Sequence, residues 1–135
     1  MSTLRLDRLE DTSSAYPSTP HGMNAGVARA WGHINCRGTV AFRASHNMSS
    51  VTDLGTGRYQ FDFNFTTTNG YSVVASSQHN TTGKPTSNDF DDMAFIGNRS
   101  ADRCYIHGAD LDQGANNDPE AISVAIFSNS YQEPG

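Results

Sequence analysis

Residues 58–65 alternate strictly between polar and aromatic side chains, directly after the glycine-rich turn 55–57. Successive side chains of a β-strand point to opposite faces of the sheet, so this period of two predicts a strand with one buried and one solvent-facing side. The aromatic side consists of Tyr59, Phe61, Phe63 and Phe65. Burial of one large apolar side chain contributes roughly 1.5 to 3 kcal/mol. This strand is therefore expected to organise the core of a β-domain.

The chain beyond residue 27 continues as short strand-like runs separated by turn residues. Ser, Thr, Asn and Gly are abundant and good helix formers are scarce, which favours strands and turns over helices. A chain of 135 residues fits one domain. We therefore predict an all-β fold over residues 28–135, an antiparallel β-sandwich of about eight short strands. The predicted strands are 29–34, 39–46, 50–54, 58–65, 71–78, 93–98, 103–109 and 121–128.

The charge pattern limits the classes of partner. The formal net charge is -5, and the basic residues are scattered rather than clustered, so nucleic acid is not an expected partner. No apolar run reaches the length of a membrane span, and Asp7, Glu10 and Asp11 stand where a signal peptide would be apolar. We expect no membrane insertion, no Sec-dependent secretion and no cofactor.

Cys36 and Cys104 are the only cysteines of the chain. They could form a disulfide, remain as two buried thiols, or be an incidental pair. His33 is close to Cys36 in the sequence and His107 is close to Cys104, but a zinc site requires four converging ligands. Ordinary core or surface roles are the favoured interpretation of these four residues.

Residues 1–27 differ in composition from the rest of the chain. Leu4, Leu6 and Leu9 stand among charged residues, and the Ser/Thr-rich stretch that follows contains prolines that prevent regular pairing. We predict an extended N-terminal arm that anchors the domain to another protein through these leucines. An ordinary frayed terminus is the alternative.

Two connections, 80–92 and 110–120, are rich in Asp and Asn and longer than the others. Loops of this length are uncommon in compact domains unless they bind a ligand or move. If the strands run up and down in order, both loops and the turn 55–57 emerge at one end, which we predict to be the binding surface. The candidate binding residues are Asn88, Asp89, Phe90, Asp91, Asp92, Asp110, Asp112, Asn116, Asn117 and Asp118. Such side chains suit sugar hydroxyls, and the alternative is that they only form turns.

Four motifs in residues 29–65 follow one another at short spacing. They are Ala30-Trp31, Gly38-Thr39-Val40-Ala41-Phe42-Arg43, Asn47-Met48-Ser49-Ser50-Val51-Thr52-Asp53 and Gly55-Thr56-Gly57-Arg58-Tyr59. This order resembles a segment of tail-fibre and related virion proteins of tailed bacteriophages, and residues 1–7 are similar to the arm with which such chains begin. The resemblance implies a non-enzymatic structural protein of the virion, a homotrimer. Its arm would attach to other virion proteins of the tail or capsid, and its β-domain would bind a host surface polysaccharide.

Two further functions remain open. The same arm and domain suit a capsid decoration protein, with the arm lying across neighbouring capsomers. Paired carboxylates also permit glycoside hydrolysis, so a polysaccharide-degrading enzyme that uses Asp89, Asp91 and Asp112 is a third hypothesis.

Residues 110–114 do not match an EF-hand, because a glycine occupies the fifth rather than the sixth position, but an irregular calcium site stays open.

Overall fold

The computed structural model describes residues 27–67, 70–78, 92–110, 115–116, 118–128 and 131–132. All regular secondary structure in these ranges is β-strand, and the strands form an antiparallel sandwich, as the sequence predicts. The strands are β1 (Ala30–Asn35), β2 (Ala41–His46), β3 (Met48–Asp53), β4 (Arg58–Phe63), β5 (Thr66–Thr67), β6 (Ser72–Gln78), β7 (Asp92–Ser100), β8 (Arg103–Asp110), β9 (Ala115–Asn116), β10 (Ala121–Phe127) and β11 (Tyr131–Gln132). The described ranges contain no helix that is long and apolar enough to cross a membrane.

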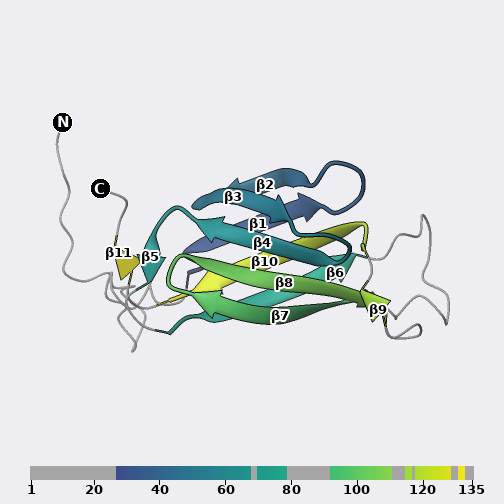
Figure 1. The fold of residues 1–135 in the computed structure, drawn as a ribbon. Coiled ribbons are helices and arrows are strands. Elements are labelled where there is room, and N and C mark those ends of the chain that lie inside the picture. Colours follow the sequence, from purple (N-terminus) through teal and green to yellow (C-terminus); the bar gives the residue numbers. More distant parts are fainter. Residues whose placement is uncertain are drawn as a thin grey trace, which may run out of the picture.

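Two sheets make up the sandwich and lie one behind the other in Figure 1. The first sheet has the order β2-β1-β10-β6, and the second has the order β3-β4-β8-β7, with β9 paired to β8. A small third pairing joins β5 to β11. Each of the eight predicted strands overlaps one of the eight longer strands of the structure, so the predicted strand number is confirmed. The arm residues Leu4, Leu6 and Leu9 lie outside the described residues.

The core lies between the sheets and is built around β4. Tyr59, Phe61, Phe63 and Phe65 are all at least nine-tenths buried, which confirms the inward side of the alternating strand. The Phe42 ring from the first sheet meets Phe61 edge-to-face, with ring centroids 6.1 Å apart. Such aromatic pairs contribute about 0.5 to 1.5 kcal/mol beyond their burial.

Gly32 lies on the inner side of β1, between the buried residues Ala30 and Ile34. A Cβ atom at Gly32 would lie only 2.7 Å from Cε1 of Phe42. The missing side chain therefore leaves room for the Phe42 ring to enter the core. The outward positions of the same strand carry Trp31 and His33.

A hydrogen-bond network ties the glycine turn to the start of β10. One carboxylate oxygen of Asp118 accepts hydrogen bonds of 2.7 Å from both the Gly57 backbone N–H and the Tyr59 hydroxyl. Gly55 and Gly57 have positive φ angles of 112° and 65°, which glycine adopts at low cost. Asp118 therefore holds the turn in place from 61 residues away in the sequence.

Both cysteines are free thiols buried in the core. Burial raises the pKa of Cys36 to about 11 and that of Cys104 to about 12, so both stay protonated near neutral pH. The two Cys/His pairs of the sequence do not converge on a metal, because strand alternation places each cysteine on the inner face and its histidine on the outer face. The described residues contain no group of three potential metal ligands.

Candidate functional site

The described ends of both long connections lie at the same end of the sandwich, as the sequence predicts. Asp92, the first residue of β7, pairs with Asp110, the last residue of β8. The Gly108 backbone N–H donates to the carbonyl of Gly57 at 2.9 Å, which adds the glycine turn to this end. It is the end marked by β9 in Figure 1, and we call it the loop end.

The structure describes four of the ten predicted binding residues. Asn88, Asp89, Phe90, Asp91, Asp112 and Asn117 lie outside the described residues. Asp92, Asp110 and Asn116 are brought together at the loop end, because Asn116 pairs with Ala109 beside the Asp92–Asp110 pair. Asp118 is near the same end, where its carboxylate is occupied by Gly57 and Tyr59.

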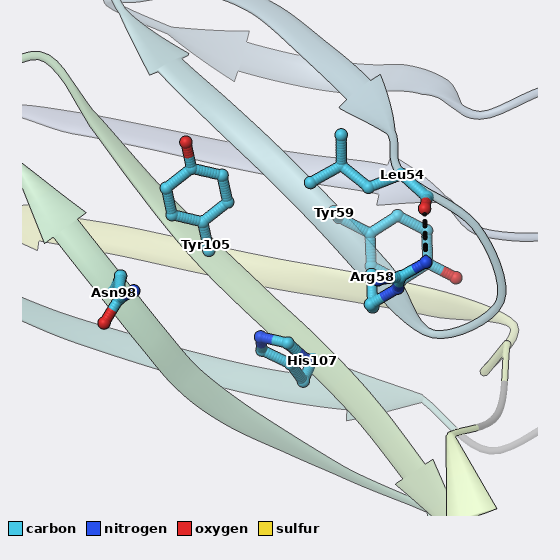
Figure 2. Close-up of a pocket in the computed structure, with 6 residues that line it drawn as sticks. All are labelled: Leu54, Arg58, Tyr59, Asn98, Tyr105 and His107. Carbon is cyan, nitrogen blue, oxygen red and sulfur yellow. Dashed lines mark hydrogen bonds between the residues drawn. The ribbon is translucent and has the colours of Figure 1, made fainter.

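An open depression of about 210 Å³ lies on the outer face of the second sheet, next to the loop end. Its lining residues are Leu54, Arg58, Tyr59, Asn98, Tyr105 and His107. Figure 2 shows that these residues come from the turn after β3 and from three neighbouring strands, β4, β8 and β7. The Tyr59 ring is 1% exposed and belongs to the core, so the side chains that face the depression are the other five.

Strand register places these side chains together. Arg58 of β4 is directly opposite His107 of β8, and Gln60 is opposite Tyr105, with all four on the outer face. The Arg58 guanidinium donates to the carbonyl of Leu54 at 2.9 Å, as the dashed line in Figure 2 shows. This hydrogen bond holds the guanidinium at the edge of the depression.

A bulge in β7 shapes the opposite wall. The β7–β8 register shifts between Ile96 and Arg99, and Gly97 and Asn98 lie in this irregular stretch. A Cβ atom at Gly97 would lie 2.8 Å from Nε2 of His107. The glycine therefore makes room for the imidazole to lie across β7, and bulges of this kind re-aim side chains at functional sites.

Charges beyond the depression are paired with one another. The Arg103 guanidinium lies 3.2 Å from Asp102 and 3.4 Å from Asp62. Hydrogen bonds to Asp102 and Tyr105 raise the pKa of Arg103, and the reciprocal bond from Arg103 lowers the pKa of Asp102. Asp62 and Asp102 are therefore paired with Arg103 rather than with Arg58.

A second hollow, of about 290 Å³, lies on the outer face of the first sheet. The Trp31 side chain, 41% exposed, and Val74 border it. Nδ1 of His33 is hydrogen-bonded to the Ser123 hydroxyl at 2.8 Å in the same hollow. The molecule thus offers an aromatic surface on each of its outer faces.

The side chains of both hollows were not singled out as a site by sequence reasoning. Arg58 and Tyr105 belong to the polar or outward side of alternating strands, where most residues simply face solvent. The one available signal was an aromatic residue on an outward position, as at Trp31 and Tyr105.

Comparisons of this chain with protein-family models, curated proteins and solved structures gave no match. The likeness of residues 29–65 to bacteriophage virion proteins therefore stays a prediction from the sequence. In the structure, this segment forms β1 to β4, which contribute two strands to each sheet.

Proposed function

We propose that this chain is a non-enzymatic binding subunit of a tailed-bacteriophage particle. In this proposal the N-terminal segment attaches the chain to other virion proteins, and the loop end of the sandwich contacts a polysaccharide on the host surface. The homotrimer implied by the sequence resemblance is part of the same proposal.

The observation that carries the proposal is the combination found at the loop end. The ends of two long Asp- and Asn-rich connections meet there, beside an open depression with an aromatic wall. Binding sites typically combine an apolar surface with a few convergent polar groups. Tyr105 supplies the ring, and Arg58, Asn98 and His107 supply the polar groups.

Glycan binding by the full-length chain tests this function. The chain is applied to an array of bacterial surface polysaccharides, together with the variant Tyr105→Ala. Trp31→Ala is the matched control, because it removes an exposed aromatic ring from the opposite face. We expect Tyr105→Ala to weaken binding about fivefold, since loss of an aromatic contact costs on the order of 1 kcal/mol, and Trp31→Ala to leave it unchanged.

Three results would contradict the binding role at this site. They are absence of binding to any glycan, full binding by the Tyr105→Ala variant, or a loss confined to Trp31→Ala. The location of the chain is tested separately by a reconstruction of particles that contain it. Density at the tail supports the proposal, and density on the head shell removes the tail location.

Capsid decoration is a second candidate, and a different observation favours it. Met93, Phe95 and Ile96 of the edge strand β7 have exposed fractions of 42%, 43% and 46%. Exposed apolar side chains on an edge strand are typical of surfaces that pack against another protein. A decoration protein makes such lateral contacts with capsomers, so density on the head shell with β7 facing a capsomer would establish this alternative.

A further inference from the structure

We infer that the depression on the second sheet binds a carboxylate-bearing sugar unit, with Arg58 as the partner of the carboxylate. This inference rests on the proposed glycan-binding function and names the chemical class of its ligand. It follows from three features of the depression: an arginine that makes no ion pair within the described part of the chain, a ring beside it, and a size that suits one sugar unit.

Arg58 differs in its pairing from three other arginines of the domain surface, Arg37, Arg43 and Arg103. Arg37 and Arg43 lie 3.9 and 3.1 Å from carboxylate oxygens of Glu120, and Arg103 is bound to two aspartates. Among the described residues, Arg58 makes no ion pair, and its guanidinium donates one hydrogen bond, to the Leu54 carbonyl. A guanidinium carries five N–H donors in a planar fork that matches a carboxylate. Arg58 therefore keeps donors available at the edge of the depression.

The neighbouring groups suit a sugar ring rather than a bare anion. The Tyr105 ring and the Leu54 side chain, which is 40% exposed, provide an apolar wall. His107 and the Asn98 amide offer hydrogen-bonding groups for hydroxyls on the opposite side. Figure 2 shows Tyr105 and Leu54 at one side of the depression and His107 and Asn98 at the other.

Size and charge narrow the ligand further. Pockets for drug-sized molecules usually measure roughly 300 to 1,000 Å³, whereas this one measures about 210 Å³ and suits a single sugar unit of a chain. The protein carries a net charge of -5, which disfavours a polyanion such as nucleic acid. The guanidinium of Arg58 offsets this negative charge locally for the one carboxylate that enters the depression.

The experiment compares two sugars that differ only in the charged group. The isotope-labelled full-length chain is titrated with methyl galacturonate glycoside carrying a free carboxylate, with methyl galactoside, and with acetate, and binding is followed by NMR shifts. We expect the acidic sugar to bind about tenfold more tightly than the neutral sugar, and acetate to bind more weakly than either, because a charge-assisted bidentate pair adds to the ring contact.

Three variants test which side chains of the depression contact the sugar. Arg58→Gln is expected to remove the preference for the acidic sugar and to leave binding of the neutral sugar in place. Arg43→Gln is the matched control, because it removes an exposed guanidinium that is paired with Glu120. Gly97→Ala is expected to weaken the binding of both sugars, since the Cβ atom of the alanine would displace the His107 ring.

The inference is overturned if the two sugars bind equally, if the Arg58→Gln variant keeps the preference, or if acetate binds as well as the acidic sugar. Equal binding of both sugars that is still lost in Tyr105→Ala would leave the proposed glycan-binding function standing. Absence of binding by every sugar on the array and in the titration would contradict both.

Discussion

Replacement of Asp118 by alanine is expected to destabilise the domain without touching its hydrophobic core. The Asp118 carboxylate accepts hydrogen bonds from the Gly57 backbone N–H and from the Tyr59 hydroxyl. Gly57 and Tyr59 are both buried, so neither donor reaches bulk water when the carboxylate is removed. The variant thus leaves two buried donors without their partner, the situation in which a lost hydrogen bond is most costly.

The expected magnitude follows from the burial of each group. A buried polar group left without a partner costs about 1 to 3 kcal/mol. The Tyr59 hydroxyl also forms a hydrogen bond with the Cys36 thiol, so losing Asp118 costs less at the hydroxyl than at the Gly57 N–H. We therefore expect Asp118→Ala to reduce the free energy of unfolding by about 2 to 4 kcal/mol. Tyr59→Phe is expected to cost only about 1 kcal/mol, because Asp118 is only partly buried and water can hydrate its carboxylate.

A double-mutant cycle measured by urea unfolding, with far-UV circular dichroism as the signal, tests this reasoning. In the Tyr59→Phe background there is no hydroxyl that Asp118→Ala could leave without a partner. The double variant is therefore expected to lose at least about 1 kcal/mol less free energy of unfolding than the sum of the two single losses. Asp118→Asn is the matched control, because its amide oxygen still accepts both bonds. Additive losses, or an Asp118→Ala variant within about 0.5 kcal/mol of the wild type, would refute the assigned role.

Three further outcomes are expected. Cys36 and Cys104, with pKa values raised by burial to about 11 and about 12, should resist alkylation by iodoacetamide at pH 8 in the folded protein and react after unfolding; rapid native-state labelling followed by mass spectrometry would contradict this. Because the same thiols ionise in the unfolded chain near the ordinary thiol pKa of 9.0, their contribution to the free energy of unfolding should be constant below about pH 9 and fall above it, in urea titrations at several pH values. Phe61→Ala should cost about 3 to 5 kcal/mol, and Gly32→Val about 1 to 3 kcal/mol by overpacking against Phe42, both by thermal unfolding; a loss below about 0.5 kcal/mol for either would contradict the packing described.

The strands were predictable because each carries its own local signal. Alternation of polar and aromatic residues identifies β4, and turn residues separate the other runs, so all eight longer strands were found from sequence. The two-residue pairings β5, β9 and β11 carry too few residues for any periodicity to be read. The change of sheet at Asn47, a non-glycine residue with a φ of 53°, was equally invisible, because asparagine is common in ordinary turns.

The site was only partly predictable, because it depends on pairing between distant strands. The grouping of the long connections at one end followed from counting strands, and the register of β7 and β8 confirms it for their described ends. The role of Asp118 was not foreseen, since its partners Gly57 and Tyr59 are about sixty residues away in the sequence. An aspartate in a turn-rich loop has the same local pattern whether it faces a ligand or a buried hydroxyl.

The depression and the core are consequences of one strand register. A shift of one residue between β4 and β8 would turn every side chain of one strand to the other face, taking Phe61 out of the core and Arg58 away from His107. The burial of Phe61 therefore fixes the position of Arg58 as well as the stability of the domain. Substitutions on the outer face, such as Arg58→Gln, leave that register in place, because the rings that specify it are on the inner face. Side chains that form the depression and side chains that specify the register thus lie on opposite faces of β4. Variants such as Arg58→Gln are therefore expected to fold normally, whereas core variants such as Phe61→Ala are expected to lose stability and binding together.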